Sequence, residues 1–310
     1  MTSLCQLPIE IIQTVLYYII GTNEDAIIHI VSTRCNEQRQ QLKKSFKTSY
    51  GRDLIEDIKS ELSGDFKETV MACFVKPAVY DAWCIKEAIY GLGTDEETLV
   101  EILMTRTNAQ INEMKEVYGD DTQLEKDIEE DTSGDFKRLL ISASQGTGMY
   151  EVNYDALTDM DQARRDAEEL YQAGEAKWGT DEETFNRIFS TRDYYSLRAI
   201  WKEYVKITQR DILNSVDRET SGDFKSGLRA IVMNIRCRPM FFAEKLMRAM
   251  KGLGTADKTI IRVIASRSEI DMVQIKECFL QLTEKTLWKW LEHDCSGDYK
   301  KLLQKLVGRD

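Results

Sequence analysis

The sequence predicts an all-α protein built from four repeats of about 70 residues each, and three observations carry this prediction. Proline accounts for 3 of the 310 residues, far below the usual ~5%, and so little proline favours long helices over turn-rich β sandwiches. The dipeptide Gly-Thr, followed by acidic residues, recurs four times along the chain. Within a repeat, the apolar residues follow a helical period.

Three sequence marks recur in a constant order and define the repeat. The Gly-Thr mark begins at Gly21, Gly93, Gly179 and Gly254. An arginine follows always at the same distance, at Arg34, Arg106, Arg192 and Arg267. A Ser-Gly-Asp triplet closes each repeat, at Ser63, Ser133, Ser221 and Ser296. Three marks in one order, four times over, indicate a repeat rather than chance similarity.

Each repeat is predicted to be a cluster of about five short helices with two glycine-bearing loops. Leu99, Ile102 and Leu103 share one helical face. Thr94 with Glu97, and Thr180 with Glu183, have the spacing of a capping box, so a helix is expected to start directly after each Gly-Thr. The Gly-x-Gly before it suits the end of the preceding helix, because glycine readily takes φ > 0.

The marks also divide the chain into segments. We expect a short N-terminal segment (1–8), repeat 1 (9–77), repeat 2 (78–148), a connector (149–166), repeat 3 (167–238) and repeat 4 (239–310). The connector is polar and lacks a sustained apolar period, so it is expected to join two halves of the molecule.

Composition narrows the class of protein. Acidic residues outnumber basic ones by 53 to 42, for a net charge of −11, which argues against binding to nucleic acid or anionic lipid through the protein's own lysines. No apolar run is long enough to span a bilayer, and no basic segment with a cleavage site indicates a signal peptide. Seven cysteines without a CxxC pair fit a reducing compartment. A cytoplasmic protein is expected.

The glycine-bearing loops favour a calcium site over a phosphate site. They lack the third glycine of a dinucleotide fingerprint and the lysine of a P-loop, and their acids disfavour an anionic ligand. Calcium prefers six to eight hard oxygens, often backbone carbonyls with a bidentate carboxylate, and a helix end presents carbonyls. No EF-hand motif is present. A carboxylate recurs just before each Ser-Gly-Asp triplet, at Glu61, Asp131, Glu219 and Asp294.

With these acids, the loops Gly91-Leu92-Gly93-Thr94, Lys177-Trp178-Gly179-Thr180 and Lys251-Gly252-Leu253-Gly254-Thr255 resemble the calcium loops of the annexins. The four repeats, the recurring arginine and the long connector are similar to the annexin core as well. The resemblance covers the chain from about Pro8 to Val307. It implies a curved, all-helical disc of four five-helix repeats in two halves, whose convex face binds calcium and, through it, acidic phospholipid.

The resemblance also implies which residues bind calcium, in each repeat three loop carbonyls and one distal carboxylate. The implied sets are Ile89, Gly91, Gly93 and Asp131 in repeat 2, Gly174, Lys177, Gly179 and Glu219 in repeat 3, and Met250, Gly252, Gly254 and Asp294 in repeat 4. The matching positions in repeat 1 are Tyr17, Ile19, Gly21 and Glu61. Because Ile19 replaces the first loop glycine, and a β-branched residue is costly at φ > 0, repeat 1 is not expected to bind calcium in this mode.

Trp178 lies between Lys177 and Gly179 in one of these loops. A tryptophan is often a core residue, but tryptophan also prefers the membrane–water interface. We hypothesise that Trp178 is exposed and enters the membrane interface when calcium binds.

The recurring arginines are expected to cap or pair within their own repeats, which is a structural role. In the annexins some charged residues line a hydrophilic channel between the halves, and the matching residues are Asp81, Glu101, Arg106 and Arg262, with Cys84 where an acid is usual. Structural salt bridges explain the same residues, so ion conduction is the weaker interpretation.

No enzyme is predicted, because His29, His293 and the cysteines assemble neither a nucleophile–base pair nor a zinc-spaced cluster. The leading interpretation is a calcium-regulated peripheral membrane protein, with Ca²⁺ as its cofactor and acidic phospholipid as its partner. Nucleic acid and small-molecule substrates are not expected, and self-association on the membrane is left open. The alternative is a calcium-insensitive helical-repeat scaffold that binds a protein partner, for which the departure at Ile19 is the sequence support.

Overall fold

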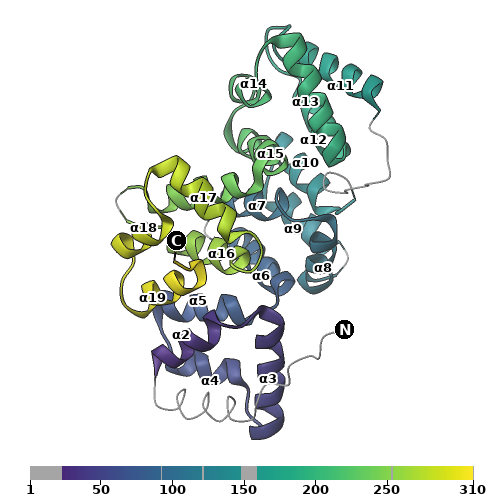
Figure 1. The fold of residues 1–310 in the computed structure, drawn as a ribbon. Coiled ribbons are helices and arrows are strands. Elements are labelled where there is room, and N and C mark those ends of the chain that lie inside the picture. Colours follow the sequence, from purple (N-terminus) through teal and green to yellow (C-terminus); the bar gives the residue numbers. More distant parts are fainter. Residues whose placement is uncertain (1–22, 92, 121, 148–158, 253, 310) are drawn as a thin grey trace. The chain divides into compact units, whose positions relative to one another are not determined.

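In this computed structural model, the chain is described over residues 23–91, 93–120, 122–147, 159–252 and 254–309. These residues form helices joined by short loops and contain no strand, which confirms the predicted all-α fold (Figure 1). None of the helices in these ranges combines the length and hydrophobicity needed to cross a bilayer.

Repeat 2 contains the predicted five helices. They are α6 (Pro77–Ile89), α7 (Glu96–Leu103), α8 (Asn108–Tyr118), α9 (Gln123–Asp131) and α10 (Gly134–Ser144). The described part of repeat 1 holds α2 (Glu24–Ser32), α3 (Asn36–Tyr50), α4 (Leu54–Glu61) and α5 (Gly64–Phe74).

Repeats 3 and 4 share one long helix, α15 (Gly222–Met250). It breaks at Cys237, whose φ of −159° and ψ of 87° are not helical. Pro239 follows two residues later. Proline has no backbone N–H to donate within the helix, and its ring clashes with the carbonyl four residues earlier, so a continuous helix is disfavoured. Repeat 3 thus consists of α11 (Met160–Ala173), α12 (Glu182–Thr191), α13 (Tyr194–Thr208), α14 (Ile212–Glu219) and the first part of α15. Repeat 4 consists of the second part of α15, α16 (Asp257–Arg267), α17 (Met272–Thr283), α18 (Leu287–Asp294) and α19 (Gly297–Val307).

The helices pack into two compact units. The described residues up to Pro77 and from Phe242 onward form unit 1, and Ala78–Phe241 form unit 2. In unit 1, α5 packs against α16 and α2 against α19, so repeats 1 and 4 share a core. In unit 2, α10 packs against α12, and α11 lies beside α13 (Figure 1). The sequence predicted that the connector joins two halves, but it joins two repeats of the same unit. Pairing between repeats is non-local, and the order of segments along the chain does not reveal it.

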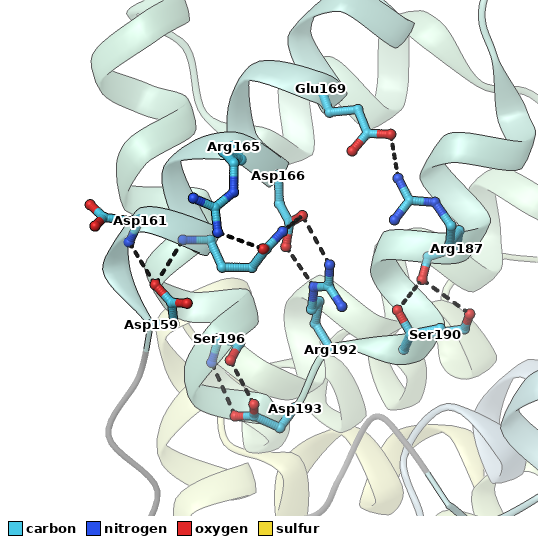
Figure 2. A network of polar contacts seen from close by, with 12 residues as sticks. Asp159, Asp161, Arg165, Asp166, Glu169, Arg187, Ser190, Arg192, Asp193 and Ser196 are labelled. Carbon is cyan, nitrogen blue, oxygen red and sulfur yellow. Dashed lines mark hydrogen bonds and ion pairs between the residues drawn. The ribbon is translucent and has the colours of Figure 1, made fainter.

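Helix α11 begins at Met160, inside the range expected to be the connector. Asp159 caps it, since its Oδ1 accepts hydrogen bonds from the backbone N–H groups of Asp161 at 3.0 Å and Gln162 at 2.9 Å (Figure 2). The buried face of α11 consists mostly of alanine and also contains Asp166. Of this buried face, only Ala163 and Asp166 lie within the range expected to be the connector, so that range shows no sustained apolar period although a helix begins in it.

The capping prediction for Thr94 is wrong. The N-cap of α7 is Asp95, whose Oδ1 accepts from the Thr98 N–H at 3.1 Å. Asp181 caps α12 in the same way, accepting from the Thr184 N–H at 3.2 Å. A cap must reach the second or third N–H of the helix, and the acid after Gly-Thr is placed to do so. The threonine hydroxyl instead donates a hydrogen bond to the distal acidic residue of its repeat, Asp131 or Glu219.

Candidate functional site

The predicted carboxylates all lie at the same place in their repeats. Glu61, Asp131, Glu219 and Asp294 are the last residues of α4, α9, α14 and α18. Asp131, Glu219 and Asp294 are half-buried, whereas Glu61 is exposed. The first predicted carbonyl ligands of repeats 2 and 4 are likewise the last residues of their helices, Ile89 of α6 and Met250 of α15. Helix C-termini carry unpaired carbonyls and partial negative charge, so these ends favour a cation.

In repeat 2 the loop closes on itself and meets its carboxylate. The Asp95 N–H donates to the Ala88 carbonyl at 2.9 Å, across the loop. Gly93 has a φ of +86°, a conformation that L side chains rarely adopt. The Thr94 hydroxyl donates to Oδ2 of Asp131 at 2.6 Å. The threonine of the Gly-Thr mark therefore holds the distal acid at the loop.

Repeat 3 repeats this arrangement with a longer acid. The Asp181 N–H donates to the Ala173 carbonyl at 2.8 Å. The Thr180 hydroxyl donates to the Glu219 carbonyl at 2.6 Å and lies 3.4 Å from Glu219 Oε2. A Cβ on Gly174 would lie 3.1 Å from Cγ of Glu219, so the glutamate side chain passes directly over the loop backbone. The Gly174 carbonyl already accepts from the Lys177 N–H at 3.1 Å, which leaves it one free lone pair.

Repeat 4 keeps the loop closure but not the threonine contact. The Ala256 N–H donates to the Ala249 carbonyl at 2.9 Å, and Gly254 has a φ of +94°. Oδ1 of Asp294 lies 2.7 Å from Nδ1 of its neighbour His293. Within the described part of this repeat, Thr255 makes no hydrogen bond to Asp294. In repeat 1, Tyr17, Ile19 and Gly21 lie outside the described residues.

The donor chemistry of the loops fits a hard cation. Among the described residues, no backbone N–H donates to the carbonyls of Gly91, Gly93, Lys177, Gly179, Gly252 or Gly254. The described ranges contain no group of three or more His, Cys, Asp or Glu side chains placed to hold a metal. A site here would therefore depend on one carboxylate and several carbonyl oxygens, a donor set that calcium accepts and that zinc does not favour. The assignment of individual ligands stays a prediction.

Trp178 is fully exposed, with a relative accessibility of 104%. The side chain therefore belongs to no core. A fully exposed tryptophan in a soluble state carries an unfavourable apolar surface, and its contact with a membrane stays a prediction.

The recurring arginines pair within their repeats, as expected, in repeats 2, 3 and 4. Arg106 donates from Nε and Nη2 to the two carboxylate oxygens of Asp81 at 2.7 and 2.8 Å, and both residues are buried. Arg192 binds Asp166 in the same two-pronged way at 2.6 and 3.0 Å (Figure 2). Burial would raise the pKa of Asp166, but its hydrogen bonds with Arg192 and Gln162 outweigh burial and lower it.

The residues proposed for a charged channel divide between the units. Asp81, Glu101 and Arg106 are buried in unit 2, and Arg262 is buried in α16 of unit 1. The Asp81–Arg106 pair gives two of the four a structural role. The channel itself stays a prediction.

Sequence reasoning missed the threonines as partners of the distal acids. Thr94 and Thr180 were interpreted as helix caps, although their recurrence beside a recurring acid was the signal for a direct contact. The contact joins residues 37 and 39 positions apart, so no local pattern contains it.

Comparisons with known proteins agree with this architecture. The annexin family model matches residues 19–73, 80–143, 165–231 and 241–306. Human annexin A7 is 50% identical over 291 residues, which cover 93% of this chain and 59% of that protein. Human annexin A11 is 47% identical over 290 residues, covering 93% and 57%. The chain thus spans less than two thirds of the length of these relatives.

Solved structures share the fold. Annexin III superposes with a TM-score of 0.93 at 38% identity, covering 100% of this chain and 96% of that one. Calcium-bound annexin (Sm)1 superposes with a TM-score of 0.86 at 29% identity, covering 97% and 90%.

Proposed function

The chain belongs to the annexin family, and from that premise we propose that it binds acidic phospholipid membranes reversibly when calcium is present. The observation that carries the proposal is the contact of Thr94 with Asp131 and of Thr180 with Glu219. In two separate repeats it brings a carboxylate to a loop with carbonyls that accept no backbone hydrogen bond from a described residue. The calcium-bound state of annexin (Sm)1, a relative in fold and sequence, supports the choice of metal.

The proposed sites use the backbone of each loop and one side chain. The residues that would hold calcium are Ile89, Gly91, Gly93 and Asp131, then Gly174, Lys177, Gly179 and Glu219, then Met250, Gly252, Gly254 and Asp294. When bound, calcium would supply positive charge and open coordination positions for a lipid phosphate oxygen. The loop glycines keep side chains away from the carbonyls, and the distal acid supplies the negative charge that neutral carbonyls lack.

Net charge gives the proposed binding its dependence on calcium. A protein at −11 is repelled by an anionic surface. Three occupied sites carry about six positive charges, concentrated at the loops. We propose that the protein is cytoplasmic at low calcium and peripheral on membranes when calcium rises. Lipid binding, without chemical conversion of a substrate, is the proposed activity.

Trp178 lies between two proposed ligands of repeat 3, Lys177 and Gly179. Because its ring is fully exposed, it can enter the interface without any rearrangement of the core. The proposal assigns it the apolar part of membrane contact, beside the ionic part made by the loops.

Co-sedimentation with vesicles tests the proposal. The full chain is mixed with vesicles of phosphatidylserine and phosphatidylcholine, either in millimolar calcium or in chelator. We expect pelleting in calcium and release on chelation. Equal pelleting in chelator, or none in millimolar calcium, contradicts the proposal and favours a calcium-insensitive scaffold. Vesicles of phosphatidylcholine alone are the control for the acidic headgroup.

A further inference from the structure

The three loops can be aligned on their own hydrogen bonds. Each loop closes on an alanine carbonyl: Ala88, Ala173 and Ala249. The residue two positions after this alanine follows the first proposed ligand and differs in every repeat. It is Tyr90 in repeat 2, Glu175 in repeat 3 and Lys251 in repeat 4.

In repeat 2 this residue bonds to the helix that carries the distal acid. The Tyr90 hydroxyl donates to Oδ2 of Asp127 at 2.6 Å. Asp127 lies one turn before Asp131 on α9 and is 5% exposed. Tyr118 donates to the same oxygen at 2.8 Å, and Gln123 donates to the other at 2.6 Å. Tyr90 thus connects the calcium loop of repeat 2 to Asp127, and Tyr118 and Gln123 hold the Asp127 carboxylate in place.

The acceptor of this bond is an ionised carboxylate. Burial acts to raise the pKa of Asp127, but the hydrogen bonds from Tyr90, Tyr118 and Gln123 outweigh it and hold the pKa below its usual range. The bond to Asp127 in turn raises the pKa of Tyr90. Hydrogen bonds to a charged group are roughly twice as strong as neutral ones.

In repeat 3 the loop also bonds to the helix that carries the distal acid, but donor and acceptor are exchanged. Glu175 accepts a hydrogen bond from the hydroxyl of Ser215 and another from Nη1 of Arg210 at 2.7 Å. Ser215 is fully buried one turn before Glu219 on α14. The acceptor is on the loop here, whereas in repeat 2 the acceptor is on the helix.

Repeat 4 lacks this connection among its described residues. The position one turn before Asp294 is Trp290, whose buried Nε1 has no hydrogen-bond partner. Its ring meets Phe279 edge to face, with centroids 5.4 Å apart. Lys251 is exposed, and its side chain makes no hydrogen bond or ion pair with any described residue. Aromatic packing occupies the place of the polar bond.

We propose that Tyr90 and Glu175 are positioning residues that tie the calcium loops of repeats 2 and 3 to the helices bearing their carboxylates, so that these two sites are ordered before calcium binds. This inference rests on the proposed calcium binding and deepens it. A site ordered in advance loses less conformational freedom on binding. Repeats 2 and 3 therefore bind calcium more tightly than repeat 4, although all three have the same kinds of ligand.

The test uses chains in which only one proposed site remains. The repeat 2 chain carries Glu219→Gln and Asp294→Asn, the repeat 3 chain carries Asp131→Asn and Asp294→Asn, and the repeat 4 chain carries Asp131→Asn and Glu219→Gln. Calcium binding is titrated by calorimetry in each. Tyr90→Phe in the first and Ser215→Ala in the second each remove the hydroxyl that bonds the loop to the helix; we call each of these loop-to-helix hydrogen bonds a tie. Lys251→Gln in the third changes the matching position where no tie exists.

We expect Tyr90→Phe and Ser215→Ala to weaken calcium binding about fivefold to tenfold, because only part of the free energy of one hydrogen bond to a charged group goes into ordering the site. Lys251→Gln is expected to change the calcium affinity of the repeat 4 chain less than about twofold, because the Lys251 side chain makes no bond from the loop to the helix. Tyr118→Phe removes another hydroxyl from Asp127 without touching the loop, and a smaller effect than that of Tyr90→Phe is expected. Unchanged affinity in both Tyr90→Phe and Ser215→Ala overturns the proposal.

A second measurement in chelator separates this inference from the proposed function. Hydrogen exchange of the Asp95 and Asp181 amides reports loop order without any metal. Faster exchange of Asp95 in Tyr90→Phe, and of Asp181 in Ser215→Ala, is expected, with Ala256 unchanged in Lys251→Gln. If the unsubstituted single-site chains take up no calcium, the proposed function fails, while exchange still tests the ties. Unchanged exchange in both variants contradicts the positioning role whether or not calcium binds.

Discussion

Repeats 3 and 4 share one backbone frame but hold their side chains in different ways. Both loops close with the same amide-to-carbonyl bond, at 2.8 Å in repeat 3 and 2.9 Å in repeat 4. Repeat 3 then adds polar bonds between distant residues, from Thr180 to Glu219 and from Arg192 to Asp166. The backbone bond that closes the loop is thus common to the two repeats, whereas the side-chain bonds differ between them.

In repeat 4 the recurring arginine and the distal acid instead make local polar contacts and an aromatic contact. Arg267 pairs with Asp271 four residues later, at 2.6 and 2.8 Å, and its guanidinium lies 4.7 Å from the ring centroid of Phe242. Asp294 contacts its neighbour His293. Similar ligand types therefore do not make the two sites alike, because the contacts that order each carboxylate differ.

The largest expected effect concerns the buried ion pair of repeat 3. Asp166 is 1% exposed and Arg192 27%, so removing the acid leaves a partly buried positive charge without its partner. We expect Asp166→Ala to lower the free energy of unfolding by about 3 kcal/mol, measured by chemical denaturation. Asp161→Ala in the same helix is the control, because its pair with Arg164 is exposed and should contribute less than about 1 kcal/mol. Equal losses in the two variants would contradict the assigned role.

The same pair predicts a pH dependence. The folded-state pKa of Asp166 is lowered, so its stabilising effect is complete above its unfolded pKa of about 4 and is lost as the pH falls through the folded pKa. The difference in stability between the parent chain and Asp166→Asn should therefore be full at neutral pH and shrink below about pH 4. A difference that persists unchanged to pH 2 would show that the carboxylate charge is not its source.

The next effect concerns the distal acids. Glu219→Ala removes the only charged ligand proposed for repeat 3 and should weaken calcium binding at that site about 100-fold, equal to about 2.7 kcal/mol. Asp294→Ala should do the same for repeat 4. Calcium-dependent pelleting with both changes measures the combined loss. Glu61→Ala is the control in repeat 1 and should leave pelleting unchanged, and unaltered calcium dependence in the double variant refutes the ligands.

A smaller effect separates the two repeats directly. Thr180→Val removes the hydroxyl that contacts Glu219 and should weaken calcium binding at repeat 3 about tenfold. Thr255→Val makes the same change in repeat 4, where no such contact exists among the described residues, and should change binding less than about twofold. Calorimetry on single-site chains measures both. Equal effects would remove the distinction between the repeats.

The smallest effect concerns Trp178, for which repeat 4 has no counterpart, since Leu253 stands at the matching position. Trp178→Ala should weaken vesicle binding about fivefold, with calcium affinity in solution unchanged, because the ring contacts the membrane and not the ion. Addition of calcium and vesicles should shift the Trp178 emission to the blue, judged against Trp178→Phe. An unshifted emission contradicts the insertion of this side chain.

The sequence was sufficient for the features that recur. Gly-Thr, the arginine and Ser-Gly-Asp predicted four helical repeats, and the family assignment confirms them. It was insufficient where a contact depends on one repeat alone. Tyr90 and Asp127 are 37 residues apart, and only the packing of α9 against the loop brings them together. The Thr94 hydroxyl was assigned to a cap because the capping-box spacing is local, whereas its partner Asp131 is not.

Helix α11 shows a second kind of limit. Of its buried residues, only Ala163 and Asp166 precede residue 167, where repeat 3 was expected to begin, and these two alone form no apolar stripe. The pairing of repeat 1 with repeat 4 likewise follows from packing of α5 on α16 and α2 on α19. Such pairing is a property of the folded chain and leaves no periodic trace in the sequence.

A crystal structure of the full chain in saturating calcium would show directly whether the loops bind calcium together with their distal acids. We expect ions in the loops of repeats 2, 3 and 4, each at about 2.3–2.6 Å from the loop carbonyls and from Asp131, Glu219 or Asp294. Loops without ions in such crystals, or ions held without these carboxylates, would contradict this expectation.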